Sequence, residues 1–309
     1  MGLCHFGSLI KFIPYTITTG FTSGIAVTIV IGQLKDFFGV TYPNGLKPIE
    51  TMEKLNAFAL GFSSFHVDAL IVGGVSLAIL IISPYIFKRI PGSLIAVVIG
   101  ILMVKFLPLH VSTIGNLYTI TNDLPSFHIP AVKFSMVKSS IPNAFTIAVL
   151  AAIESLLSCV VADGMINGKH RSDTELVAQG LGNIASALFG GIPATGAIAR
   201  TAANIKNGGR TPVAGMVHSI TLVIVLVVLM PFAGMIPMPT IAAILFVVAY
   251  NMCQWRTFVH MLKTAPKSDI IVLIVTFILT VVFDLVVAIE IGMVIACLLF
   301  IKRMSEETH

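Results

Sequence analysis

Long apolar runs separated by short polar connections are the feature that most constrains how this chain can fold. Apolar residues make up 56% of the sequence and charged residues 11%, and the mean hydropathy is +0.98. Soluble domains do not have this composition, and an α-helix needs about 20 apolar residues to cross a bilayer. The sequence therefore predicts an all-α membrane protein with roughly ten membrane segments, at residues 12–33, 68–87, 93–108, 141–162, 176–189, 195–206, 213–230, 239–252, 270–283 and 285–301.

The basic residues lie in the connections between the apolar runs. A net charge of +5 spread in this way does not form the single basic face that binds nucleic acid, so no nucleic-acid partner is expected. If the segments alternate, the short loops of one side receive most of the basic residues, which are Lys88, Arg89, Lys169, Arg171, Arg210, Arg256, Lys263, Lys267, Lys302 and Arg303. The positive-inside rule then predicts that both ends of the chain, including the C-terminus, lie in the cytoplasm. We expect a multi-pass protein of the plasma (inner) membrane.

Cysteine and histidine residues are scattered along the chain. The four cysteines, Cys4, Cys159, Cys253 and Cys297, have neither the pattern of a disulfide framework nor the spacing of metal ligands. The HExxH and GxSxG motifs of common hydrolases do not occur in the sequence. We therefore expect no metal, no cofactor and no enzymatic activity.

The stretch GGIPATGAIART, residues 190–201, places glycine, proline and arginine within an apolar region. Pro193 suits the position just before a helix, and Gly208 and Gly209 suit its end, which predicts a short helix over residues 195–206. About 12 residues span about 18 Å, roughly half a bilayer. Non-helical backbone at that depth is tolerated only beside a water-filled cavity, so the break predicts a binding site.

An anion is the ligand that the start of this half-helix would attract. Free N–H groups around residues 196–198 carry partial positive charge, and Arg200, about one turn further on, adds a full charge. The alternative role for Arg200 is a structural ion pair with Glu154 that holds two helices together. The residues predicted to bind the substrate are Thr195, Gly196, Ala197, Ile198 and Arg200.

Glu154 is a second ionisable side chain at membrane depth, near the middle of the segment at 141–162. Ser158 follows at i+4 and therefore lies on the same helical face. A carboxyl group in an apolar environment binds a proton more readily than one in water. Glu154, with Ser158 beside it, is therefore predicted to carry a proton that is coupled to movement of the substrate.

Two further sets of residues receive a structural interpretation. Glu290, in the last segment, is expected to make a structural hydrogen bond and not to take part in transport. Gly20, Thr22, Ser23 and Gly24 form a face of small residues, which is expected to pack against another helix.

Four stretches resemble the sulfate permease (SulP) family of anion transporters, to which the animal sulfate/anion exchangers are related. They are GFTSGIAVTIVIGQLKDFFGV at 20–40, IESLLSCVVADGMINGKHR at 153–171, ELVAQGLGNIASALFGGIPATGAIARTAANIKNGGRTPVAG at 175–215 and VAIEIGMVIACLLFIKRM at 287–304. The resemblance implies about fourteen segments in two inverted repeats of seven, with a core that carries the anion and a gate that scaffolds the core. In such folds the anion lies between the N-termini of two half-helices.

When the chain is compared with this family, its first membrane segment resembles the fifth membrane segment of the family. The resemblance thus implies a partial 7+7 inverted-repeat fold that lacks the first four segments and the C-terminal STAS domain. A homodimer is expected at full length, and no anion uptake is expected from these 309 residues alone. The implied parts are gate segments at 1–110, an extracellular loop at 111–140, core segments with a half-helix (195–206) at 141–235, and gate segments with a cytoplasmic tail at 236–309.

These features together predict a secondary active anion transporter, in contact with membrane lipid, that works by alternating access and proton symport. Sulfate or a related inorganic anion, bicarbonate and a dicarboxylate remain open as substrates. The resemblance implies that Glu154 and Ser158 form the coupling-ion site, because they match the positions that hold the cation in sodium-coupled bicarbonate members of the family. Those members look to carry aspartate where this chain has Glu154, which speaks against sodium as the coupling ion. The alternatives are an anion channel and a nucleobase permease of the related fold. Arg200 argues against the permease because a neutral base gains little from a fixed guanidinium.

Overall fold

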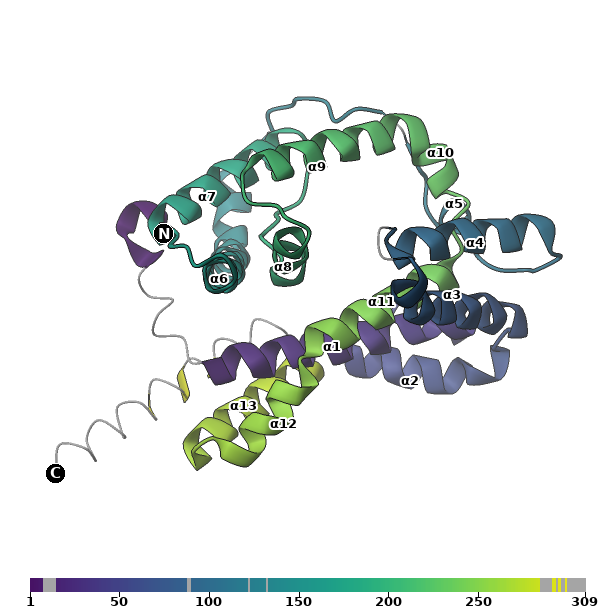
Figure 1. Ribbon diagram of the computed structural model, residues 1–309, viewed down its shortest axis with the longest axis horizontal. Helices are drawn as coiled ribbons and strands as arrows, with labels where there is room; N and C mark the ends of the chain where they lie inside the picture. Colours follow the sequence, from purple (N-terminus) through teal and green to yellow (C-terminus); the bar gives the residue numbers. More distant parts are fainter. Residues whose placement is uncertain are drawn as a thin grey trace. The chain divides into compact units, whose positions relative to one another are not determined.

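The computed structural model describes residues 1–7, 15–87, 90–121, 123–131 and 133–283, and positions 291, 292, 294, 295 and 298 of the last segment. Within these residues the regular structure is helical, apart from an isolated antiparallel bridge between Thr113 and Pro237. This confirms the prediction of an all-α protein. The chain forms two compact units (Figure 1): unit 1 comprises residues 1–13 and 122–228, and unit 2 comprises residues 14–121 and 229–309.

Unit 1 is built around a long helix that contacts two shorter ones. This helix, α6 (Phe134–Ile166), packs against α7 (Ser172–Leu188) and α8 (Ile198–Lys206). Asn167 ends α6 in the left-handed conformation, with φ 55°, and so turns the chain towards α7. The remaining elements of the unit are η1 (Gly2–Cys4) and α9 (Val213–Ile224), and the chain then continues through the π-helical turn η5 (Val225–Leu229).

Unit 2 is built around α1 (Tyr15–Phe38), which packs against α11 (Met238–Cys253) and α13 (Lys267–Val282). Its buried apolar core consists of Phe37, Leu80, Ala96, Ala242 and Ala243. Figure 1 shows α12 and α13 at one end of this unit and α2, α3 and α4 at the other. The other elements are α2 (Thr51–Gly61), α3 (Val67–Ile86), α4 (Gly92–Phe106), α5 (Ile114–Leu117), α10 (Met230–Ala233), α12 (Trp255–Thr264), η3 (Pro43–Gly45) and η4 (Phe62–Ser64).

Small residues allow α1 to approach α13 closely. A Cβ atom added to Gly20 would lie 2.6 Å from the carbonyl oxygen of Leu273, and one added to Gly24 would lie 2.6 Å from the Cβ of Thr280. Close approach over small residues is the usual way in which helices associate within a bilayer. The contacts therefore agree with the helix-packing interpretation of this face.

Five helical stretches of the described part are long and apolar enough to cross a membrane, namely Thr16–Phe38, Val67–Ile86, Phe134–Ile166, Val213–Ala233 and Met238–Thr264. The fourth stretch covers α9, η5 and α10, and the fifth covers α11 together with α12. The apolar helix α4 is shorter, with 15 residues. Nine of the ten predicted segments overlap a helix. The tenth, at 285–301, lies outside the described residues except for five positions, and Glu290 lies outside them too. The number of membrane crossings therefore stays a prediction.

Some stretches that are predicted to be connections are helical. The predicted loop at 111–140 contains α5 and the first turns of α6, and α2 and α12 also lie in predicted loops. Charged residues lower the hydropathy of α2 and α12 without removing the apolar face by which a helix packs. Hydropathy averaged over a window misses such helices. The core and gate roles of the predicted domains remain predictions.

Candidate anion site

The segment between α7 and α8 is non-helical and is held by side chains of α7 and by a backbone carbonyl of α6. Asn183 of α7 clamps the backbone of Ala194: its Oδ1 accepts from the Ala194 N–H at 2.8 Å, and its Nδ2 donates to the Ala194 carbonyl at 3.0 Å. Thr195 donates through Oγ1 to the carbonyl of Ala151 on α6 at 2.8 Å. An unsatisfied backbone group is costly in a bilayer, so these hydrogen bonds allow the helical pattern to break here.

The side chains of α7 that hold this segment follow a helical spacing. Gln179, Asn183 and Ser186 lie at i, i+4 and i+7 and so share one face of the helix. Gln179 donates through Nε2 to the carbonyls of Ala151, at 3.2 Å, and Ala194, at 3.3 Å. Ser186 donates to the Ile192 carbonyl at 3.1 Å. These residues were not predicted, although three polar side chains at this spacing in an apolar segment are the signal for such a face.

The half-helix begins at Ile198, three residues later than the predicted start at 195. The reason is the extended backbone of Ala197, with φ −92° and ψ 122°, which follows the clamped segment. The first bond of the α8 ladder runs from the Thr201 N–H to the Ala197 carbonyl, at 3.0 Å. The N–H groups of residues 198–200 therefore have no acceptor within the helix and form its positive end.

Buried hydroxyl groups of α6 lie next to the start of α8. Ser158, which is 4% exposed, donates to Oγ1 of Thr201 at 2.7 Å. A Cβ atom added to Gly196 would lie 3.7 Å from Oγ of Ser155 and 3.8 Å from Cβ of Ser158, so this glycine rests on the same face of α6. Ser155 donates in turn to Oε1 of Glu175 on α7, at 3.0 Å. The structure thus places Ser158 beside α8 and adds Ser155, Glu175 and Thr201, which were not predicted.

Glu154 is half-buried on α6, and Arg200 is exposed on α8. The ion pairs within the described ranges join histidine to aspartate, His5 to Asp173 and His170 to Asp163. Glu154 and Arg200 are therefore not paired with each other, which speaks against the structural role considered for Arg200. A guanidinium near the N-terminus of a helix is a favourable environment for an anion.

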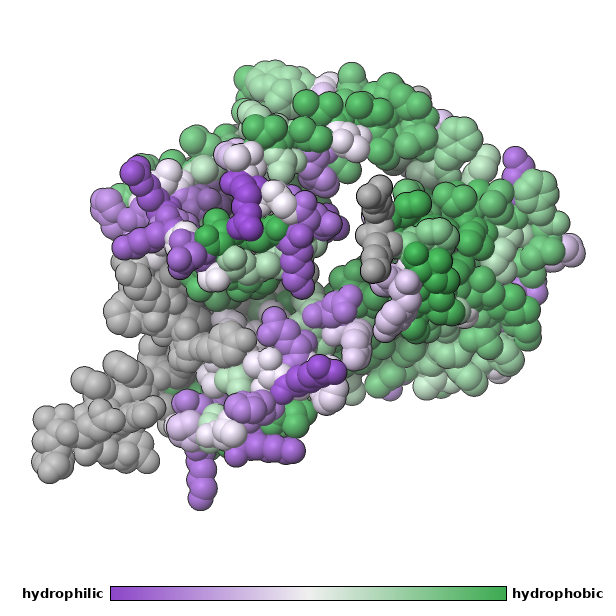
Figure 2. All heavy atoms as spheres, viewed as in Figure 1, coloured by the Kyte–Doolittle hydropathy of each residue, from purple (hydrophilic) through white to green (hydrophobic). Residues whose placement is uncertain are grey.

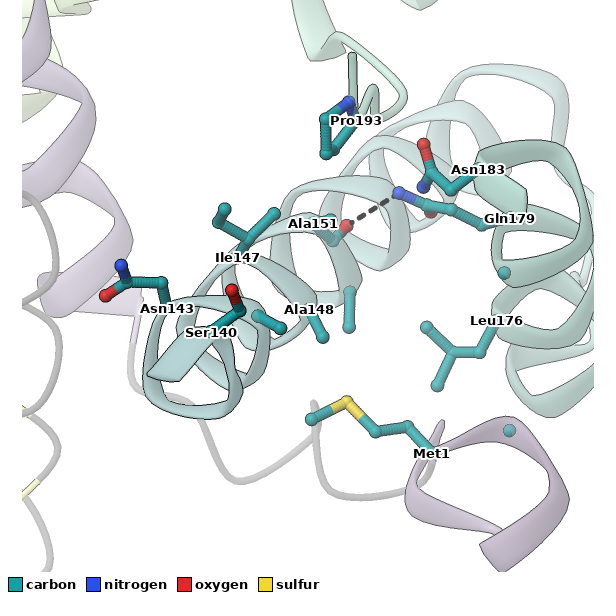
Figure 3. A pocket seen from close by; sticks show the side chains of 14 residues that line it. Met1, Ser140, Asn143, Ile147, Ala148, Ala151, Leu176, Gln179, Asn183 and Pro193 are labelled. Carbon is teal, nitrogen blue, oxygen red and sulfur yellow. Dashed lines mark hydrogen bonds between the residues drawn. The ribbon is translucent and has the colours of Figure 1, made fainter. Parts of the chain in front are cut away.

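A pocket of about 480 Å³ lies between α6 and α7, beside Pro193 (Figure 3). Ser140 and Asn143 of α6 and Gln179 and Asn183 of α7 give it polar lining groups. Figure 3 shows the Gln179 side chain reaching the carbonyl of Ala151. The lining does not include the residues of the predicted anion site on α8, so this pocket is a different feature of unit 1. Across the described residues, no group of three or more His, Cys, Asp or Glu could hold a metal ion.

The sequence of the chain is similar to that of known transporters. A model of the sulfate permease family matches residues 1–276. The chain is 41% identical over 314 residues to "Putative sulfate transporter YvdB" of Bacillus subtilis (strain 168) and 35% identical over 306 residues to "Bicarbonate transporter BicA" of Picosynechococcus sp.. These alignments cover 100% and 98% of this chain but 58% and 53% of the relatives. The chain thus spans little more than half the length of these relatives.

Solved structures show the same fold. The transmembrane domain of a cyanobacterium bicarbonate transporter BicA matches 93% of this chain and 71% of its own, with a TM-score of 0.78 and 30% identity. SLC26A9 matches 94% of this chain and 47% of its own, with a TM-score of 0.82 and 21% identity. The helices described above therefore have the arrangement of a multi-pass transmembrane domain.

Proposed function

Because the chain belongs to the sulfate permease family, whose members are transporters and not enzymes, we propose that the protein is a secondary active transporter of a small anion. The observation that carries this proposal is the hydrogen-bonded break before α8. There, a non-helical segment is fixed by hydrogen bonds of Asn183 and Thr195, and a helix N-terminus with an exposed arginine follows it. A fixed positive end at membrane depth fits an anion better than a neutral solute.

The anion binds at the first turn of α8. The N–H groups of residues 198–200 and the guanidinium of Arg200 donate to its oxygens, and a guanidinium can do so with two parallel N–H groups. The approach to this turn is formed by Thr195, Gly196 and Ala197, because they are the non-helical residues directly before it. Thr201 and Ser158 join the turn to α6 through their 2.7 Å hydrogen bond.

Coupling is assigned to Glu154, which carries a proton together with the anion. The support is its half-buried position on the same face of α6 as Ser158 and the lack of an ion pair with Arg200. Protonation would let the Glu154 side chain enter an apolar environment without a charge, so the carboxyl group can bind and release a proton during the transport cycle. Sodium at the same position is the competing assignment.

Sulfate and bicarbonate are the substrates to test first, because the names of the two relatives refer to them. Both are oxyanions whose oxygens suit backbone N–H and guanidinium donors. The core at 141–235 moves against the gate segments at 1–110 and 236–309 in this proposal, and two copies associate as a homodimer. The division of the chain into two compact units supports separate roles for the parts.

The test is uptake of radiolabelled sulfate or bicarbonate by proteoliposomes that contain the protein produced from its complete native gene. We expect saturable uptake that increases when the outside is made more acidic than the lumen. Uptake that follows a sodium gradient would move the coupling assignment to sodium. Conduction without saturation or a proton requirement would indicate a channel, and uptake of a neutral nucleobase without any anion would contradict the proposal.

A further inference from the structure

α12 is a short helix between two apolar helices of unit 2. Gln254 separates it from α11 with a left-handed backbone, φ 44° and ψ 40°, and Ala265 and Pro266 separate it from α13. α11 ends where α12 begins, and α13 starts three residues after α12 ends, at Lys267. A helix that joins the ends of two membrane segments in this way lies at the boundary between bilayer and water.

One face of α12 packs against the protein. Phe258, Met261 and Leu262 are half-buried. The ring of Phe258 lies 5.3 Å from the ring of Phe277 on α13. This contact fixes the rotation of α12 about its axis, and thereby decides which side chains point away from the unit.

The exposed side of α12 consists of an apolar stripe and a basic stripe. Trp255, 47% exposed, and Val259, 37% exposed, form the apolar stripe. Arg256, His260 and Lys263 are exposed at i, i+4 and i+7 and form the basic stripe beside it. The helix contains no acidic residue. Figure 2 shows hydrophilic residues gathered over this end of unit 2.

The two stripes match the two layers of a membrane surface. Tryptophan prefers the headgroup level of a bilayer, with its ring near the acyl chains. Lysine and arginine beside it attract anionic headgroups. The Arg256 guanidinium lies 5.8 Å from the centre of the Trp255 ring, so the charge sits directly above the side chain that would enter the bilayer. A soluble partner would match the basic stripe but would leave Trp255 and Val259 without their apolar environment.

We propose that the exposed side of α12 is a binding surface for anionic phospholipid. Arg256 and Lys263 contact the phosphate and headgroup, while Trp255 and Val259 enter the adjoining acyl layer. The bound lipid would hold the connection between α11 and α13 at the interface. This inference rests on the membrane location of the chain and not on the anion that it transports.

Trp255 allows a direct test because it is the single tryptophan of the chain. Brominated lipids quench tryptophan fluorescence on contact. The protein is reconstituted in two parallel phosphatidylcholine samples, one with brominated phosphatidylglycerol and the other with the same fraction of brominated phosphatidylcholine. We expect about two- to fivefold stronger association of the brominated phosphatidylglycerol with Trp255, from electrostatic attraction to nearby basic residues. High salt should reduce this preference in the unaltered protein, because ions screen exposed charges.

The double variant R256Q/K263Q should quench equally with the two lipids. The matched control, K47Q/K54Q, removes the same charge from another part of unit 2 and should keep the preference. Equal quenching by the two lipids in the unaltered protein would overturn the proposal, and so would quenching by neither lipid. A preference that persists in R256Q/K263Q or at high salt would also overturn it, because the basic stripe would then not select the headgroup.

Discussion

Two ionisable side chains carry the proposed chemistry at the scale of single residues. Arg200 is exposed directly after the positive end of α8, and Glu154 is half-buried on the neighbouring helix. A charge in an apolar environment needs a compensating partner. The two residues do not form an ion pair with each other in the structure, and the proposal assigns each of them to a transported ion.

Replacing Arg200 by alanine should weaken anion binding by about 1.5 to 3 kcal/mol, or roughly ten- to a hundredfold, through the loss of charge-assisted hydrogen bonds. Lysine should restore part of the affinity, because it supplies the charge without the planar fork. Anion affinity is measured by titration of the purified protein. Unchanged affinity together with a lower melting temperature would show that Arg200 has a structural role instead.

Replacing Glu154 by glutamine should remove the dependence of uptake on the proton gradient while leaving anion binding measurable. Glutamine has nearly the shape of a protonated glutamate but cannot release a proton. The measurement is initial uptake rate at a series of external pH values, in vesicles with fixed internal pH. A normal increase of uptake by E154Q at acidic external pH would exclude Glu154 as the proton carrier.

At the scale of secondary-structure elements, α7 fixes the broken segment and α1 forms a close seam with α13. Both arrangements depend on a small number of side chains. Asn183 alone provides two of the hydrogen bonds that hold Ala194, and Gly20 allows backbone contact with Leu273. Each can be tested with a control substitution of the same type.

Asn183→Ala should lower stability by about 1 to 3 kcal/mol, because it leaves the Ala194 N–H without its partner and the Ala194 carbonyl with Gln179 as its remaining donor. The altered segment should also weaken anion binding at α8. Asn207→Ala is the control, since the Asn207 side chain bonds only the carbonyl of Ala203 within its own helix end. Equal effects of the two substitutions on melting temperature and anion affinity would show that the clamp is not required.

Gly20→Ala should destabilise the protein by about 1 to 3 kcal/mol, because the new methyl group would overlap the carbonyl oxygen of Leu273. Gly32 lies on the same helix, but a Cβ atom there meets nothing within 4 Å. Gly32→Ala should therefore be neutral or should raise stability by up to about 1 kcal/mol, through better helix propensity. Thermal unfolding in detergent compares the two. A tolerated Gly20→Ala would mean that the helices can separate at this point without cost.

At the scale of the whole molecule, the chain has the fold of a multi-pass transmembrane domain and spans 58% of one relative and 53% of another. The predicted orientation in the membrane rests on the distribution of basic residues over the short loops. Lys302 and Arg303 contribute to that argument but lie outside the described residues. The orientation is therefore best tested directly.

Cys4 is exposed and should face the cytoplasm. In a variant whose other cysteines are replaced by serine, a membrane-impermeant maleimide should label Cys4 only after the cells are permeabilised. Ser126→Cys in the same background, without Cys4, should be labelled in intact cells, because Ser126 is exposed in the predicted extracellular loop at 111–140. Labelling in the reverse pattern would invert the predicted topology.

The sequence by itself determined the features that depend on neighbouring residues. Apolar runs predicted the membrane helices because hydropathy and span length are local properties. Pro193 marked the break before α8, although the hydrogen-bonded backbone before it moved the helix start from 195 to Ile198. Local averaging failed at α2 and α12, where charged residues lie on one face of a helix that still packs.

Only the tertiary structure decided which side chains meet. Ser158 and Thr201 are 43 residues apart and form a hydrogen bond because α6 and α8 pack together. Asn183 could be recognised as polar from the sequence, but its partner, the backbone of Ala194, depends on how the chain turns after α7. The absence of an ion pair between Glu154 and Arg200 also depends on the tertiary structure. Their opposite charges predict attraction, but the packing of the helices decides which charged groups lie close enough to pair.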